Sequence, residues 1–464
     1  MKIALIKIKQ KYFDLEICDA LTNLKKKEIV EIKYSNLIAN NISKKNDQYF
    51  EAIFPEVVKL LNKTKNTNLS PDFWKILIGP WLYKTIEFFN DKFYIIKKLP
   101  KNRKYIFRKT YFQKFRFNDI YDLYNDEKFC KYSIFVLNKF LKKNKINITL
   151  DKTRILNYKN KVVKNENNFF TNKLKYFLRK IFYYITLRKK YNFKILNINS
   201  PLLSNELKNL SDKNNNLSDN FLSLVKLNNV PYLNKDKRIS IDKNFNEEFL
   251  DSFKNLINDW LPIEYGEEFN SNLFFYKKQI IKNNPKFIIV RGPHETSVQI
   301  RFLIALFKEY KKSKIISFQE GGIGKFYYQE DYENYSLIGT DIFLQWSNLK
   351  TKRNIYNFYV TKTFWKKEYN IPKNEKILLI LGSFRKIFFS YYEGHLPDYS
   401  FIQLQQIDNL LLDKKIFDRS KIRFHKNFGF NEKKYLQKKY KALDISTRED
   451  IPYFYDLLSK FSLK

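Results

Sequence analysis

The sequence predicts an α/β protein with two domains, each built around a parallel sheet. A short apolar, β-branched segment, Phe287–Val290, precedes a helical pattern and a second such segment at 315–318. Together these form a strand–helix–strand unit, the repeating unit of parallel sheets. A further apolar run at 376–381 begins a new series of strands, after a connector that contains a proline. We therefore expect an N-terminal domain at 1–363 and a C-terminal domain at 364–464.

Length and composition fit a globular protein of two or three domains. The chain has 464 residues, of which 44% are hydrophobic. Its two cysteines, Cys18 and Cys130, lie far apart and suit a reducing compartment. The sequence shows neither a signal peptide nor an apolar run long enough to span a membrane. We therefore expect a cytoplasmic protein.

The formal net charge of +39 raises the question of an anionic partner. Lys, Asn, Ile, Phe and Tyr are abundant whereas Gly, Pro and Met are rare, which is the amino-acid profile of an AT-rich genome. The lysines are spread along the whole chain and do not form one basic arm, so we expect no specific nucleic-acid binding. A loose peripheral contact with anionic headgroups of the inner membrane fits this distribution better.

In the N-terminal domain one strand precedes mainly helical segments. Alternating apolar residues at the start of the chain predict the strand. A helical pattern covers 49–98, and Gly79-Pro80 is expected to kink or break it. We interpret Trp74 and Trp81 as core residues rather than as a platform on which a substrate stacks. Further helical patterns form an insertion at about 100–285 and cover 117–141, 170–193, 249–261 and 264–282.

The basic, aromatic segment 170–193 has two interpretations. It fits a helix on a membrane surface, or one that extends its lysines over the surface of its own domain. The C-terminal domain follows with strands at 376–381 and 421–424, a helix at 401–412 and a last helix at 451–461.

The distribution of glycine indicates a binding loop after the strand at 315–318. The chain has only 10 glycines, and five of them lie between residues 287 and 346. Gly321, Gly322 and Gly324 come directly after the strand, and a plain tight turn would need fewer. Because ligands bind at the carboxyl ends of parallel strands, we favour a ligand-binding loop over a simple turn.

Two separated blocks resemble a bacterial family of transferases whose genes lie among those for O-antigen and other surface carbohydrates. The first, at 73–82, reads Phe-Trp-Lys-Ile-Leu-Ile-Gly-Pro-Trp-Leu, where the family has Tyr-Trp-Arg-Ile-Leu-Leu-Gly-Pro-Trp-Leu. The second reads Gln-Glu-Gly-Gly at 319–322, Glu-Asp-Tyr-Glu at 330–333, Asp341, and Leu-Gln-Trp at 344–346. The family has Gln-His-Gly-Gly, Glu-x-His-Glu, Ser-Asp and Leu-Thr-Trp-Gly there. The resemblance covers about 45–464.

The chain departs from the family pattern in three ways. The family's N-terminal opening is not visible in residues 1–45. Glu320 and Tyr332 stand where the family has histidines. The family also continues with another strand and a Thr-rich loop after the helix that matches 451–461, so we expect the C-terminal domain to be truncated, with weak or no donor binding by itself.

The resemblance implies two Rossmann-like domains facing a cleft, the type-B arrangement of glycosyltransferases. The N-terminal domain would hold the acceptor, a glycan or a lipid-linked glycan, and the C-terminal domain a nucleotide-sugar donor. The implied activity is sugar transfer in surface polysaccharide biosynthesis, such as that of O-antigen or capsule, without a bound cofactor. Since the chain has no Asp-x-Asp triad, basic side chains and helix N-termini would neutralise the diphosphate in place of a metal.

Candidate site residues follow the carboxyl ends of the predicted strands. Groups that can act as general base are Glu320, His294 and Glu333. Groups expected to bind the substrate are Arg291, Gln319, Gly321, Gly322, Gly324, Asp341 and Trp346. Groups expected to bind the donor are Gly382, Ser383, Arg423 and His425. For Glu333 a loop carboxylate paired with a lysine is the alternative, and for each histidine a structural role.

Two other functions remain open. The missing family histidines favour a degenerate homologue that binds carbohydrate without turnover. The charge alone favours a basic, nucleic-acid-associated protein.

Overall fold

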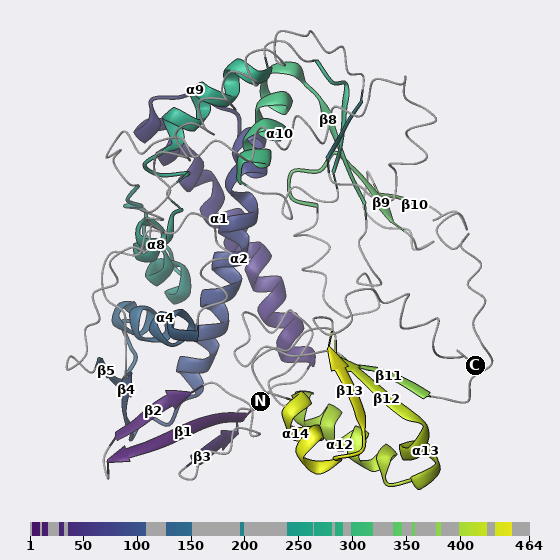
Figure 1. The fold of residues 1–464 in the computed structure, drawn as a ribbon. Helices are drawn as coiled ribbons and strands as arrows, with labels where there is room; N and C mark the ends of the chain where they lie inside the picture. The colour runs from purple at the N-terminus through teal and green to yellow at the C-terminus, as the bar shows by residue number, and fades with distance from the viewer. Residues whose placement is uncertain are drawn as a thin grey trace, which may run out of the picture.

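The computed structural model describes residues 2–9, 12–16, 27–31, 36–107, 127–150, 195–198, 239–262, 264–280, 284–290, 298–318, 337–345, 355–357, 377–381, 399–424 and 432–447. Among these residues the strands form three separate sheets, one mixed and two parallel (Figure 1). No helix of these ranges is long and apolar enough to cross a membrane.

The N-terminal sheet is mixed and has the strand order β3-β1-β2-β4-β5. Its strands are β1 (Lys2–Lys9), β2 (Tyr12–Glu16), β3 (Lys27–Glu31), β4 (Lys104–Phe107) and β5 (Asn147–Leu150). Strand β1 is antiparallel to β2 and β3, whereas β2, β4 and β5 are parallel to one another. The sequence predicted only the first of these strands.

The five-stranded sheet is entirely parallel and follows the chain in order, β6 to β10. Its strands are β6 (Ile195–Ile198), β7 (Phe287–Val290), β8 (Lys314–Phe318), β9 (Ile342–Gln345) and β10 (Ile355–Asn357). The predicted pairing of β7 with β8 is confirmed, with Phe287 opposite Lys314.

The three-stranded sheet is also parallel and consists of β11 (Ile377–Leu381), β12 (Ser420–Phe424) and β13 (Asp444–Thr447). It therefore confirms the prediction that the strand at 376–381 belongs to a different sheet from β7 and β8. Helices α12 (Tyr399–Leu411), α13 (Lys414–Arg419) and α14 (Glu432–Lys439) accompany it. Within the described ranges, its own core contains seven buried side chains between Leu404 and Ile445.

Two long helices, α1 (Asn36–Lys65) and α2 (Pro71–Lys98), pack side by side through the middle of the molecule (Figure 1). The side-chain oxygen of Ser70 caps α2 by accepting a hydrogen bond of 3.2 Å from the Phe73 amide, and Pro71 occupies the first turn. Helix α2 is buried on nearly all sides, as expected of a helix in the centre of a core.

The other helices surround this pair: α4 (Glu127–Phe140), α8 (Glu248–Trp260), α9 (Phe269–Ile280) and α10 (Val298–Lys311). They share one core with α1 and α2 that extends from Tyr49 to Ile338. Trp74 stacks on Phe269 with ring centroids 4.9 Å apart, and the Trp81 indole donates a hydrogen bond of 3.0 Å to the Trp260 carbonyl. Both Trp74 and Trp81 are fully buried, which confirms their interpretation as core residues.

The expected interruption at Gly79-Pro80 does not end the helix, because α2 continues through both residues to Lys98. The boundary between α1 and α2 lies earlier, at Asn66, whose φ of 53° is the left-handed conformation that ends helices. Proline removes one helical hydrogen bond, but packing around the buried helix compensates for that loss.

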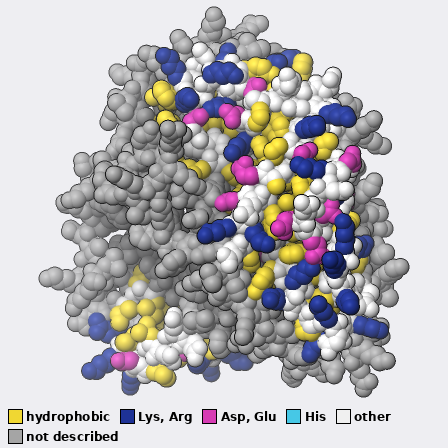
Figure 2. Space-filling model, turned by 180° about the vertical axis from the view of Figure 1, so that it is seen from behind, with side chains coloured by type: hydrophobic (Ala, Val, Ile, Leu, Met, Phe, Trp, Pro, Cys, Tyr) yellow, Lys and Arg dark blue, Asp and Glu magenta, His cyan; other side chains and the backbone are white. Residues whose placement is uncertain are grey.

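Charged side chains are scattered over the described surface. Figure 2 shows lysines and arginines interspersed with aspartates and glutamates on the face opposite to that of Figure 1. No single basic stripe crosses the described part of this face. The predicted helices at 170–193 and 451–461 lie outside the described residues.

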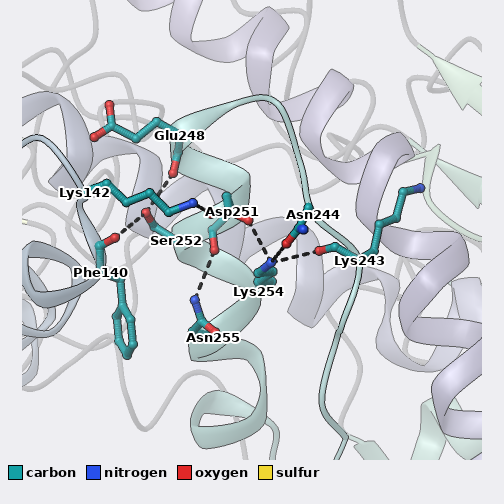
Figure 3. A network of polar contacts seen from close by, with 9 residues as sticks. All are labelled: Phe140, Lys142, Lys243, Asn244, Glu248, Asp251, Ser252, Lys254 and Asn255. Atoms are coloured by element: carbon teal, nitrogen blue, oxygen red, sulfur yellow. Dashed lines mark hydrogen bonds and ion pairs between the residues drawn. The ribbon is translucent and has the colours of Figure 1, made fainter.

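A polar network joins the end of α4 to α8 (Figure 3). Asp251 forms ion pairs with Lys142 at 2.5 Å and with Lys254 at 2.7 Å. The Ser252 hydroxyl donates a hydrogen bond of 3.1 Å to the carbonyl of Phe140. Hydrogen bonds from Lys142 and Lys254 lower the pKa of Asp251 to about 2.

Candidate functional site

The carboxyl edge of the five-stranded sheet is where the sequence places the acceptor site. All five strands are parallel, so their last residues meet at one edge: Ile198, Val290, Phe318, Gln345 and Asn357. Arg291 and His294 follow β7, Gln319 and Glu320 follow β8, and Trp346 follows β9. The strands that lead to these residues therefore end side by side. The residues themselves, with Gly321, Gly322, Gly324 and Glu333, lie outside the described residues.

The first turn of α10 lies at this same edge. Its last residue, Lys311, is joined to the start of β8 by only Lys312 and Ser313, so the C-terminal end of α10 lies at the amino edge. A helix of 14 residues spans about 20 Å, which returns its first turn to the carboxyl edge. Helix α9 runs parallel to α10, because Phe269 contacts Phe302 at 5.6 Å and Lys277 covers the Tyr310 ring at 4.6 Å.

Several charged side chains are buried at these helix ends. Arg301, in the first turn of α10, is 1% exposed, and Glu264 and Glu267, just before α9, are 8% and 3% exposed. Buried Lys65 donates a hydrogen bond of 2.5 Å to the Gly266 carbonyl. Charged groups are rarely buried unless they are paired or functional, so this end of the sheet has an unusual charge content.

The acidic residues here influence one another. Burial raises the pKa of Glu268, and the negative charge of Glu267 raises it further. Burial also raises the pKa of Tyr276, together with the charges of Glu264 and Glu268. A carboxyl group that retains its proton more readily is suited to acid–base chemistry. A buried guanidinium is suited to binding an anionic group.

The sequence pattern did not single out Glu264, Glu267, Glu268 or Arg301. The only signal for Arg301 is its place in an otherwise apolar helix, Ile-Arg-Phe-Leu-Ile-Ala-Leu-Phe at 300–307. A buried charge can be recognised from the sequence only when it is known which face of the helix packs into the core.

Asp341 lies at the opposite, amino edge. It immediately precedes β9, and its carboxylate accepts a hydrogen bond of 2.8 Å from the Ile315 amide at the start of β8. It also forms an ion pair with Lys308 near the end of α10. Asp341 thus lies at the edge of the sheet opposite to the last residues of β7, β8 and β9.

The two blocks of the family resemblance pack against each other. A Cβ atom on Gly79 of α2 would lie 2.7 Å from Cγ2 of Ile338. A Cβ atom on Gly339, whose φ is +74°, would lie 2.7 Å from Cγ1 of Ile76. Only glycine allows so close an approach at both positions, which explains the glycines in these two segments.

The second half of α2 carries polar residues into the core. Lys84 and Glu87 form a buried ion pair at 2.7 Å. The Tyr83 hydroxyl donates to Asp47 at 2.8 Å, and the Asn90 amide donates to Asn46 at 2.8 Å. The last two contacts join α2 to α1, so they fix the packing of the two central helices.

In the three-stranded sheet, Arg423 lies on the face away from the helices. Its neighbour Ile422 packs into the core with α12 and α14, and successive side chains of a strand point to opposite faces. Lys421 and Asp444 form an ion pair at 2.5 Å on the same face as Arg423. Beside Arg423 in the register is Ser446, whose buried hydroxyl makes no hydrogen bond within the described part of the chain.

The remaining donor-side residues follow the ends of β11 and β12. These two strands end in register, with Leu381 opposite Phe424. Gly382, Ser383 and His425 come next in the chain and lie outside the described residues. Within the described ranges, no group of three or more His, Cys, Asp or Glu side chains could hold a metal ion.

Comparison with known proteins identifies one family. The profile described as LIC12162 family transferase matches residues 19–463. Neither a curated protein nor a solved structure matches the chain.

Proposed function

We propose that this chain, which belongs to the LIC12162 family of transferases, moves a sugar from a nucleotide-activated donor to a glycan or lipid-linked acceptor. The family match carries the transferase assignment, because it extends over both parallel sheets. Two further parts of the proposal rest on the resemblance of the sequence blocks at 73–82 and 319–346. These are that the transferred group is a sugar, and that the chain acts in O-antigen or capsule synthesis at the cytoplasmic side of the membrane.

The acceptor is proposed to bind at the carboxyl edge of the five-stranded sheet. Glu320 lies two positions after the end of β8 and would accept the proton of the attacking hydroxyl. His294 and Glu333 are the other candidates for this role. The other groups proposed to orient the acceptor are Arg291, Gln319, Trp346 and the backbone of Gly321, Gly322 and Gly324.

The donor is proposed to bind at the three-stranded sheet, in a domain at 364–464. The acceptor oxygen would form a bond to the anomeric carbon, while the bond from that carbon to the diphosphate breaks. The electron pair of that bond leaves with the diphosphate, whose charge Arg423 and His425 would neutralise. The amides of Gly382 and Ser383 would hold the phosphates.

Two observations bear on the alternative functions. Glu320 and Tyr332 replace family histidines, which favours a homologue that binds carbohydrate without turnover. The scattered lysines of Figure 2 give no support to a dedicated nucleic-acid surface on the described face.

A nucleotide-release assay tests the proposal. The chain is incubated with a panel of nucleotide sugars, with and without lipid-linked glycan acceptors, and free nucleoside diphosphate is measured. We expect acceptor-dependent release with one donor, and a loss of at least about a hundredfold in Glu320→Gln. The matched control is Lys415→Gln on exposed α13, which should retain full activity.

A thermal-shift screen of the same compounds separates the alternatives. A shift in melting temperature without release would favour the binding homologue, since a bound ligand stabilises a protein regardless of turnover. Neither shift nor release with any nucleotide sugar would contradict the proposal.

A further inference from the structure

Exposed aromatic side chains gather at the amino edge of the five-stranded sheet. Phe274 of α9 is 64% exposed, Tyr310 of α10 is 43% exposed, and Phe287 at the start of β7 is 37% exposed. Single exposed apolar residues are common on protein surfaces, but a group of large ones marks an interaction surface.

Contacts between neighbouring side chains and strands connect the three aromatic residues into one surface. The Lys278 ammonium lies 3.9 Å from the Phe274 ring centroid, and the Lys277 ammonium lies 4.6 Å from that of Tyr310. Since Lys277 and Lys278 follow Phe274 by three and four positions, all three lie on one face of α9. Tyr310 lies in the last turn of α10, and a short turn joins this helix to Lys314 at the start of β8. Lys314 is opposite Phe287 in the sheet.

The same surface is strongly basic. Its exposed lysines are Lys277, Lys278, Lys286, Lys312 and Lys314. Segments 269–290 and 298–318 together contain a single acidic residue, Glu309. The carboxylate of Glu309 accepts hydrogen bonds from the hydroxyl and amide of Ser70, so it is engaged at the start of α2. Asp341, at the same edge, forms an ion pair with Lys308 and accepts a hydrogen bond from the Ile315 amide. Both carboxylates are therefore engaged with other groups, and little negative charge is left to balance these five lysines.

We propose that this basic aromatic surface, comprising the three aromatic residues and the five lysines, docks on a membrane rich in anionic lipid. Lysines contact anionic headgroups, and aromatic side chains settle at the level of the headgroups with their apolar parts toward the acyl chains. The inference is independent of sugar transfer, because it rests on surface charge and exposure alone.

The geometry favours lipid over nucleic acid as the partner. A lysine ammonium covers one ring face of both Phe274 and Tyr310, and so competes with base stacking on that face. Docking at this surface also uses the amino edge of the sheet. It leaves the carboxyl edge, where the acceptor site is proposed, directed away from the docked surface.

Vesicle co-sedimentation tests the proposal. The full chain is mixed with vesicles of phosphatidylcholine alone and of phosphatidylcholine with phosphatidylglycerol. We expect binding only to the anionic vesicles, weakened by added salt. The double variant Lys277→Gln/Lys278→Gln should bind about thirtyfold more weakly, and Phe274→Ser about tenfold more weakly.

Matched controls lie on the three-stranded unit. Lys414→Gln/Lys415→Gln removes two adjacent exposed lysines, and Leu412→Ser removes a side chain that is 80% exposed. Equal losses in these controls, or equal binding to neutral vesicles, would overturn the proposal. It would also be overturned if vesicles were not bound while a single-stranded oligonucleotide was bound through Lys277 and Lys278. None of these measurements requires transferase activity.

Discussion

The two parallel sheets differ in how much core supports them. The five-stranded sheet is part of a continuous core with α1, α2, α8, α9 and α10 that extends from Tyr49 to Ile338. Among the described residues, the three-stranded sheet has a separate core of seven buried side chains. Local stability follows buried apolar contact, so the first sheet is a rigid platform and the second a less stable unit. A less stable unit is suited to close on a ligand and to be stabilised by it.

The largest expected effect is on the platform, from Trp81→Ala. Trp81 is fully buried and its indole donates a hydrogen bond to the Trp260 carbonyl, so truncation leaves a cavity and removes this hydrogen bond. We expect the free energy of unfolding, measured in urea, to fall by about 4 kcal/mol. Trp81→Phe, which keeps most of the ring volume, should lower the free energy of unfolding clearly less. Equal losses in the two variants would show that the lost side-chain volume is not the cause of the destabilisation.

Ile422→Ala tests whether the three-stranded unit is separate. Ile422 is fully buried in the smaller core, and its truncation should cost about 3 kcal/mol of local stability. Amide hydrogen exchange should accelerate in β11, β12 and β13 while β7 and β8 keep their rates. Equal acceleration in both sheets would mean that they unfold as one cooperative unit, and the comparison would fail.

Gly79→Ala measures the close approach between α2 and the segment before β9. The new Cβ would meet Ile338 at 2.7 Å, which costs about 2 kcal/mol, while helix propensity returns about 1 kcal/mol. We expect a net loss of about 1 kcal/mol in urea unfolding. In the background Ile338→Ala the same change should become neutral or stabilising. Additive losses in the double variant would contradict the contact.

The smallest effect concerns pH and Asp251, at the junction of α4 and α8. Its pKa is lowered from the ordinary 3.8 to about 2, so its carboxylate stabilises the fold above about pH 4. This contribution should disappear as the pH falls from about 4 to about 2. Because Lys142 is largely exposed, solvent screening keeps the effect small. Asp251→Asn should flatten this part of the stability curve, and an unchanged curve would contradict the assignment.

The elements that the sequence predicted well share a strong local signal. Strands β7, β8 and β11 are mainly apolar runs, β12 alternates polar and apolar residues, and α2 carries an apolar pattern over most of its length. The N-terminal sheet was largely missed, because β4 and β5 are four-residue strands that are separated in the chain by α4. Such pairings depend on distant contacts rather than on local periodicity.

The candidate site was predictable only in part. Parallel topology brings the strand ends that precede Arg291, Glu320 and Trp346 to one edge, as the pattern indicated. Asp341 was assigned to the same site from its motif, yet its carboxylate bonds to the Ile315 amide at the other edge. Motif membership does not reveal whether a carboxylate serves a ligand or a backbone amide.

The central claim is that the three-stranded unit binds the donor. Amide hydrogen exchange in the presence of nucleotide sugars is its most direct test. The chain is labelled with and without each member of a panel of uridine, guanosine and cytidine nucleotide sugars. We predict that one of them slows exchange in β11 and β12, and that Arg423→Lys weakens this protection, since a single ammonium cannot replace the bidentate guanidinium. Unchanged exchange in β11 and β12 with every nucleotide sugar, or protection confined to β6–β10, would contradict the account.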